Sequence, residues 1–205
     1  MGLVSLISLS TAMLILAASP GPGVFATVAR SLASGFQPAL GVILGIVLGD
    51  LIYLMFAIFG LSLVAQKLGE LFIIVKLCGG AYLFWLGLKI WVSKPSPDGS
   101  EPLQKEQSPW GNILSGFLIT LSNPKVILFY CGLLPTFVDL SNLKGADIAA
   151  IACVIAVILS GVLMVYAYLA SHARQMFSSG SALKKLNRSA GGVMMATGVA
   201  IATKI

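Results

Sequence analysis

The sequence predicts an all-α membrane protein with six transmembrane helices, arranged as two inverted three-helix repeats. Hydrophobic residues make up 58% of the 205 residues. The chain has 13 basic and 7 acidic residues, where a soluble domain of this length has about 50 charged residues. Six apolar stretches have the roughly 20 residues that cross a bilayer, and the two halves share sequence features. So few charges exclude an ordinary soluble domain, a disordered chain and a nucleic-acid binder.

The six apolar stretches follow one another with mostly short connections. The first is retained as structure, not as a cleaved signal peptide, because no Lys or Arg precedes it and Pro20 closely follows its small residues. The second contains a single charge, at Asp50, and the fifth contains none. Six spans leave little of the chain for a soluble domain. The stretches are residues 3–29, 38–64, 71–92, 110–138, 148–171 and 186–205.

A linker, residues 93–109, divides the chain into a first repeat, residues 1–92, and a second repeat, residues 110–205. It is rich in Pro, Ser and charged residues and lacks a periodic pattern. Eight Lys and Arg residues flank the first, third and fifth connections, and four flank the opposite side. Because cytoplasmic loops are enriched in Lys and Arg, we expect the linker in the cytoplasm and both termini outside.

The two halves resemble each other at corresponding positions. The third and sixth stretches both begin with a basic-x-x-Gly-Gly pattern, at residues 76–80 and 188–192, an offset of 112. The same offset places Gly49 on Gly161. Chance similarity between Gly-rich apolar helices is the alternative interpretation. Because each half has an odd number of spans, the second would cross the membrane in the opposite sense, as is typical of secondary transporters.

Proline interrupts the first stretch inside the membrane. Pro20 and Pro22 lack an N–H, and their rings clash with the preceding turn, so the helix cannot continue. A new helix should start near Val24, with free N–H groups and a partial positive charge at its N-terminus. Such an end suits a carboxylate. We therefore predict substrate-binding roles for Pro20, Gly21, Pro22 and Gly23.

A second break in the fourth stretch aligns Pro124 with Pro20. Asn123 is a favourable N-cap and Pro124 a favourable first helical residue. Lys125 would then lie at a positive helix end, and a lysine in hydrocarbon costs at least about 2.5–3.5 kcal/mol. A carboxylate or an anionic ligand should compensate. Asn123, Pro124 and Lys125 are therefore also predicted to bind substrate.

Asp50 is the only acidic residue inside a predicted span. It could serve purely structural pairing. Alternatively it binds a substrate ammonium group or carries a proton, because burial disfavours the charged form of a carboxyl group. We expect Asp50 to face the cavity near Lys125, where pairing would lower the cost of both charges and a zwitterionic substrate could separate them. The sequence leaves open whether the two pair directly. Asp50 is thus predicted both to bind substrate and to couple transport to protons.

Gly41, Gly45 and Gly49 recur every four residues and share one helix face. Such a stripe of small residues favours close helix packing, the role predicted here. It would also permit helices to slide or a homodimer to form, without requiring either.

These motifs resemble the signatures of the LysE/RhtB-type amino-acid exporters, which include lysine, threonine and homoserine exporters, over nearly the whole chain. The resemblance implies a six-span bacterial inner-membrane protein that exports a small amino acid or derivative. It also implies proton antiport with alternating access around a midplane site, in a lipid bilayer and without a cofactor. The similar segments are residues 19–23, 45–50, 76–87, 123–125 and 134–139.

Two other functions stay open at this stage. An ion or metal exporter would need several carboxylate, His or thiolate ligands, and one acid beside one lysine is a poor metal site. A transmembrane redox protein would need cysteines at the breaks, but Cys78, Cys131 and Cys153 lie elsewhere. Without a CxxC motif or a nucleophile–base pair in the spans, we expect neither a metal site nor an enzyme.

Overall fold

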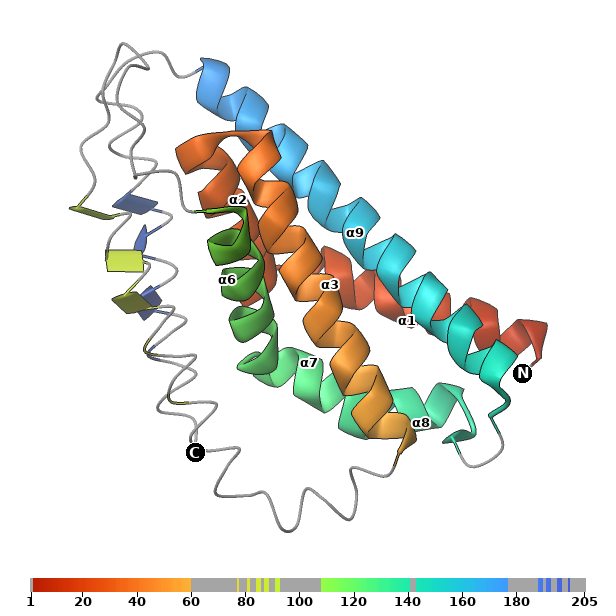
Figure 1. Ribbon diagram of the computed structural model, residues 1–205. Coiled ribbons are helices and arrows are strands. Elements are labelled where there is room, and N and C mark those ends of the chain that lie inside the picture. Colours follow the sequence, from red (N-terminus) through yellow and green to blue (C-terminus); the bar gives the residue numbers. More distant parts are fainter. Residues whose placement is uncertain are drawn as a thin grey trace.

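The computed structural model describes residues 2–59, 108–140 and 143–176, and individual helical residues between 77 and 92 and between 188 and 199. The regular elements within these residues are all helices, packed into one bundle (Figure 1). The predicted all-α class is confirmed for this part of the chain. Most of the linker and of the third and sixth stretches lies outside the described residues. The six-helix inverted repeat therefore stays a prediction.

The first predicted stretch folds as two helices with a bend between them. α1 (Leu3–Ala18) and α2 (Pro22–Ser34) are bent by 53° at the break. Pro22 begins α2, two residues before the expected restart near Val24, because the fixed φ of proline suits the first helical position. Gly35 follows with a φ of 88°, in the left-handed region that favours glycine, and leads directly into the next helix.

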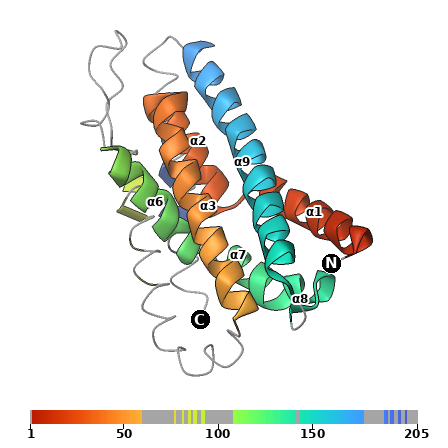
Figure 2. The ribbon, with the colours of Figure 1, turned by 45° about the vertical axis from the view of Figure 1, so that its right-hand side comes forward.

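α3 (Phe36–Ile58) and α9 (Gly145–Met176) are the long helices of the described bundle. α3 and the first 29 residues of α9 are each long and apolar enough to cross a membrane, and the bent pair α1–α2 is a third candidate. α3 and α9 run in opposite directions and pack together (Figure 1 and Figure 2). α9 starts earlier than predicted because Asp147 accepts a hydrogen bond from the Lys144 N–H at 3.1 Å and suits the positive helix end.

The fourth predicted stretch is divided into four short elements. α6 (Pro109–Leu121) ends at the predicted break, and α7 (Pro124–Leu128) begins directly after Asn123, as expected. A π-helical turn, η1 (Phe129–Leu133), follows and leads into α8 (Leu134–Phe137). The sequence analysis did not predict this π-helical turn.

Glycines bring α3 and α6 into close contact. A Cβ atom on Gly45 would overlap the backbone of Ile113, and a Cβ on Gly116 of α6 would overlap the backbone of α3 in return. Gly41 and Gly49 face the same helix, where a Cβ would lie only 2.8 Å from side-chain atoms of α6. The predicted glycine stripe therefore lines the α3–α6 contact in this structure.

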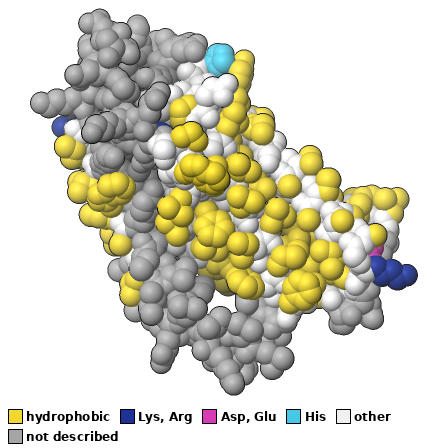
Figure 3. Space-filling view, viewed as in Figure 1, with side chains coloured by type: hydrophobic (Ala, Val, Ile, Leu, Met, Phe, Trp, Pro, Cys, Tyr) yellow, Lys and Arg dark blue, Asp and Glu magenta, His cyan; other side chains and the backbone are white. Residues whose placement is uncertain are grey.

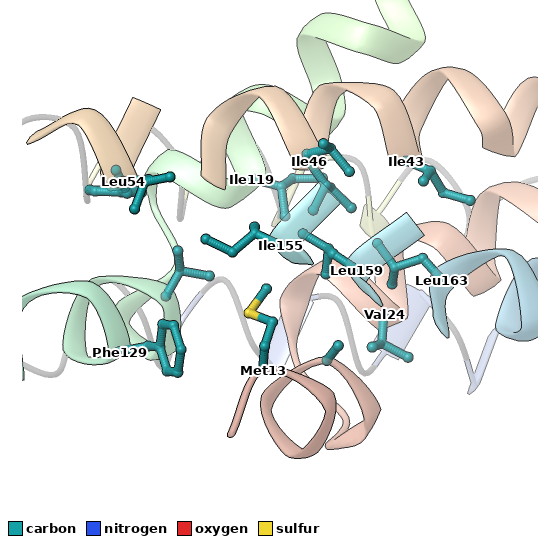
Figure 4. Packing of buried hydrophobic residues seen from close by; sticks show 14 of the residues in the cluster. Met13, Val24, Ile43, Ile46, Leu54, Ile119, Phe129, Ile155, Leu159 and Leu163 are labelled. Atoms are coloured by element: carbon teal, nitrogen blue, oxygen red, sulfur yellow. The ribbon is translucent and has the colours of Figure 1, made fainter. Parts of the chain in front are cut away.

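The described bundle is apolar outside as well as inside. Hydrophobic side chains cover most of the described surface in Figure 3. On α9, Val157 and Leu169 are 64% and 60% exposed. Beneath this surface, Met13, Phe129 and Ile155 pack in the core (Figure 4). A helix that is hydrophobic on all sides is typical of a membrane span. With the candidate spans, this identifies a multi-pass helical membrane protein.

We expect Gly45→Ala to destabilise the protein, because the new methyl group forces α3 and α6 apart. Overpacking of this kind costs about 1–3 kcal/mol, and each kcal/mol lowers the Tm of a chain this long by about 2–4 °C. Thermal unfolding of the purified protein in detergent measures the effect. Gly161→Ala is the matched control, since no described atom outside its own helix turn lies within 4 Å of its added Cβ. Equal Tm values for the two variants would contradict the prediction.

Candidate functional site at the two helix breaks

The two helix breaks meet at one pocket in the middle of the bundle. The pocket has a cavity volume of about 40 Å³, below the roughly 300–1,000 Å³ of most small-molecule sites. It contains residues of both breaks and Asp50 of α3, which are far apart in the sequence. The described lining residues are Leu16, Ala17, Gly21, Gly23, Val24, Ile46, Asp50, Thr120, Asn123, Lys125, Val126, Leu159 and Leu163.

The end of α1 obtains its hydrogen-bond partners from the second half of the chain. A helix that stops leaves its last carbonyl groups without backbone partners. The Nζ of Lys125 donates to the carbonyl oxygens of Leu16 at 2.5 Å and Ser19 at 2.7 Å. The hydroxyl of Tyr166 on α9 donates to the carbonyl oxygen of Ala18 at 2.8 Å. The negative end of the α1 dipole thus compensates the Lys125 ammonium group.

Lys125 and Asp50, whose direct pairing the sequence leaves open, are not paired in this structure. Lys125 donates to the α1 carbonyl groups instead, and no hydrogen bond or ion pair within 4 Å joins the two described side chains. The sequence shows that a buried lysine needs a negative partner, but it does not show that a helix C-terminus will supply one. The half-buried ammonium group still lines the same pocket as Asp50.

The start of α2 is an uncapped helix N-terminus beside Lys125. No side chain caps it, and the first N–H groups of a helix have no partner within the helix. Gly21, Gly23 and Val24 all line the pocket. A Cβ on Gly21 would lie 3.7 Å from the Nζ of Lys125, so the ammonium group lies next to this helix end. Two positive groups therefore adjoin one space, an arrangement that favours an anion.

The start of α7 differs from that of α2 because it is already capped. The Oδ1 of Asn123 accepts a hydrogen bond from the Lys125 N–H at 3.1 Å. Asn123 therefore acts as the N-cap that the sequence predicts, with Pro124 in the first helical position. The anion-binding potential of the described site is thus concentrated at the first break.

Asp50 lines the pocket and has one carboxylate oxygen in a hydrogen bond. The residue is 1% exposed. Its Oδ1 accepts a hydrogen bond from the Tyr130 hydroxyl at 3.1 Å, and its buried Oδ2 has no hydrogen-bond partner among the described residues. The Tyr130 ring stacks on Tyr53 of α3 at a centroid distance of 6.1 Å. An unpaired buried carboxylate oxygen is costly, so this atom is suited to a cationic or hydrogen-bonding ligand.

The π-helical turn η1 carries Tyr130 to Asp50. π-helical turns are rare and occur frequently at functional sites. Tyr130 is almost fully buried, and its ring lies against Phe129 in an edge-to-face contact at 5.3 Å. Tyr130 has no role in the prediction from the sequence. The structure assigns Tyr130 a direct contact with the predicted proton-coupling residue.

Two tyrosines, one from each half of the chain, each donate a hydrogen bond to the end of the broken helix in the other half. Tyr53 of α3 donates to the carbonyl oxygen of Leu121, the last residue of α6, at 2.5 Å. Tyr166 of α9 does the same for Ala18, the last residue of α1. The tyrosines are 113 residues apart, one more than the offset of the proposed repeat. This separation is the sequence signal that could have identified Tyr166.

The prolines of both breaks determine where the helices end and begin, and they do not line the pocket. Pro20 and Pro124 are exposed, and Pro22 is buried in the first turn of α2. None of them is among the described lining residues. Gly21, Gly23, Asp50, Asn123 and Lys125, in contrast, surround the common pocket.

Comparison with known proteins agrees with this architecture. The family model of the LysE type translocators matches residues 14–205. The chain belongs to the LysE type translocator family. This confirms the resemblance found in the sequence and the prediction of a transporter rather than an enzyme.

Members of the family that resemble this chain include proteins named for the export of amino acids. An uncharacterized membrane protein of Synechocystis is 37% identical over 97% of this chain and 96% of its own length. A homoserine/homoserine lactone efflux protein of Salmonella typhimurium is 28% identical over 92% and 91%. A leucine efflux protein of Klebsiella pneumoniae is 31% identical over 63% and 61%. No solved structure matches the chain.

We expect Tyr166→Phe to destabilise the translocator, because the Ala18 carbonyl group loses its partner. The lost hydrogen bond is worth about 0.5–1.5 kcal/mol, and each kcal/mol corresponds to about 2–4 °C in Tm. The measurement is thermal unfolding in detergent. Tyr168→Phe is the control, since Tyr168 lies on the same helix and is 54% exposed. A Tm for Tyr166→Phe that equals the control value would refute a capping role.

Proposed function

We propose that this protein exports a small amino acid or amino-acid derivative from the cytoplasm by proton antiport, with alternating access around the pocket between the two breaks. Its family membership supports transport. Relatives named as homoserine/homoserine lactone, threonine and leucine efflux proteins support an amino-acid substrate. The proposal includes a bacterial inner membrane, with both termini outside and the linker in the cytoplasm.

The charges around the pocket match those of a zwitterion. The substrate carboxylate binds the Lys125 ammonium group and the uncapped start of α2, and the substrate ammonium group binds Asp50. The observation that carries the proposal is Asp50, which lines the same pocket as Lys125 and whose buried Oδ2 has no hydrogen-bond partner in the described part of the chain. A bound zwitterion would satisfy both charged side chains at once.

Substrate binding is coupled to the first helix break through Lys125. In this structure the ammonium group donates to the carbonyl oxygens of Leu16 and Ser19. A substrate carboxylate competes for these donors, because hydrogen bonds between charged groups are stronger than those to a neutral carbonyl. Partial release of the α1 end then permits a change in the angle between α1 and α2. This is the step that links occupancy to alternating access.

Proton antiport results because a proton and the substrate ammonium group compete for the Asp50 carboxylate. The ionised Asp50 carboxylate binds the substrate ammonium group. Protonated Asp50 has no negative charge and no longer binds the ammonium group. A proton arriving from outside therefore displaces the substrate, and release of the proton to the cytoplasm restores the binding form. One proton moving down a potential of about 100 mV supplies about 2.3 kcal/mol, enough for a substrate gradient of roughly 50-fold.

We expect Asp50→Asn to abolish proton-driven accumulation. The amide cannot carry the proton and binds an ammonium group weakly, so accumulation falls from about 50-fold toward unity. The measurement is uptake of radiolabelled amino acids into inverted membrane vesicles with an imposed proton gradient. Asp147→Asn, at the surface end of α9, serves as the control. Wild-type accumulation by normally inserted Asp50→Asn would disprove the coupling role, and uptake of no amino acid by the wild type would disprove export.

We expect Lys125→Met to weaken recognition of the substrate carboxylate. Loss of a charge-assisted hydrogen bond costs about 1.5–3 kcal/mol, or roughly tenfold or more in Kd. Calorimetry on the purified protein compares a transported amino acid with the amine that lacks its carboxylate. Wild type should prefer the amino acid, and Lys125→Met should lose this preference, whereas Lys144→Met keeps it. An unchanged preference in Lys125→Met would show that the carboxylate binds elsewhere.

A further inference from the structure

The described lining of the pocket forms an aliphatic surface beside its charged groups. Branched aliphatic side chains reach it from α1, α2, α3, α7 and α9, so this surface is built by the whole bundle. Figure 4 shows part of this set gathered in one region of the core. The residues are Leu16, Val24, Ile46, Val126, Leu159 and Leu163.

The charged groups of the described lining and the Asn123 cap already have other roles. Asp50 and Lys125 are matched by the zwitterionic part of the substrate. The side-chain Oδ1 of Asn123 accepts the hydrogen bond that caps α7. Thr120 is 1% exposed, and its Cβ and Cγ2 atoms lie against Gly49 of α3. Within the described lining, no further charged group remains for a substrate side chain.

We infer that the substrate is an uncharged amino acid with a branched aliphatic side chain, of the valine or leucine type. This inference rests on the proposed amino-acid export and names the substrate class of that site. An aliphatic side chain gains free energy by leaving water for this surface. A hydroxyl group would lose its hydrogen bonds to water there, and a second charge would be buried without a partner. Serine, threonine, homoserine and lysine are therefore poor substrates.

Valine and threonine provide the sharpest test, because they have nearly the same shape and differ by one hydroxyl group. The purified protein in proteoliposomes is given an equal proton gradient with each labelled amino acid, alongside leucine, homoserine and lysine. We expect a kcat/KM for valine about 100-fold above that for threonine, the discrimination typical when a hydrophobic pocket meets such a pair. Threonine, homoserine or lysine transported as efficiently as valine would overturn the inference. Transport of no amino acid would instead refute the proposed function.

Substitution of a lining residue tests whether this pocket determines the preference for valine over threonine. Val24→Thr keeps the shape of the side chain and adds one hydroxyl group at the lining, so the ratio of valine to threonine transport should fall at least about tenfold. Val126→Thr tests the opposite break and should act in the same direction. Val165→Thr is the matched control, because Val165 is 59% exposed on α9. A wild-type ratio in both lining variants would show that the substrate side chain binds elsewhere and would overturn the inference.

Discussion

A helix that breaks inside a membrane must find partners for the carbonyl groups of its last turn, because lipid provides none. In this protein the end of α1 receives them from Lys125 and Tyr166, which belong to the second half of the chain. These bonds hold α7 and α9 against α1 and bring the second break next to the first. The position of the ammonium group in the pocket, and therefore the chemistry of the site, depends on them.

The same capping makes the site available to a substrate. If Lys125 were paired with Asp50, a zwitterion would first have to separate a buried ion pair, and a buried charge that loses its partner is costly. Here the ammonium group is held by neutral carbonyl oxygens, and Asp50 is held by one hydroxyl group, from Tyr130. Both charges keep part of their binding capacity. The site is therefore stable when empty and still able to bind opposite charges of a ligand.

Features fixed by local rules could be predicted from the sequence, and those fixed by distant contacts could not. The breaks and the Asn123 cap follow from the properties of proline and asparagine, and Asp50 was conspicuous as a lone acid. The α1 carbonyl partners of Lys125 were not predicted, because the sequence contains charges but not the position of a helix end. The bonds made by Tyr53 and Tyr166 join residues 68 and 148 positions apart. No local pattern indicates such contacts.

The two tyrosine bonds join helices from opposite halves of the chain. α3 is joined to α6 by close glycine packing and by the Tyr53 hydroxyl. α9 is joined to α1 by packing and by the Tyr166 hydroxyl, and α3 and α9 also pack against each other. Each pair combines a long helix from one half with the first part of the broken helix from the other half, and both pairs line the pocket. In the proposed alternating-access cycle, a movement that keeps both tyrosine bonds would leave Leu121 and Ala18 capped while Lys125 exchanges its α1 carbonyl partners for the substrate carboxylate.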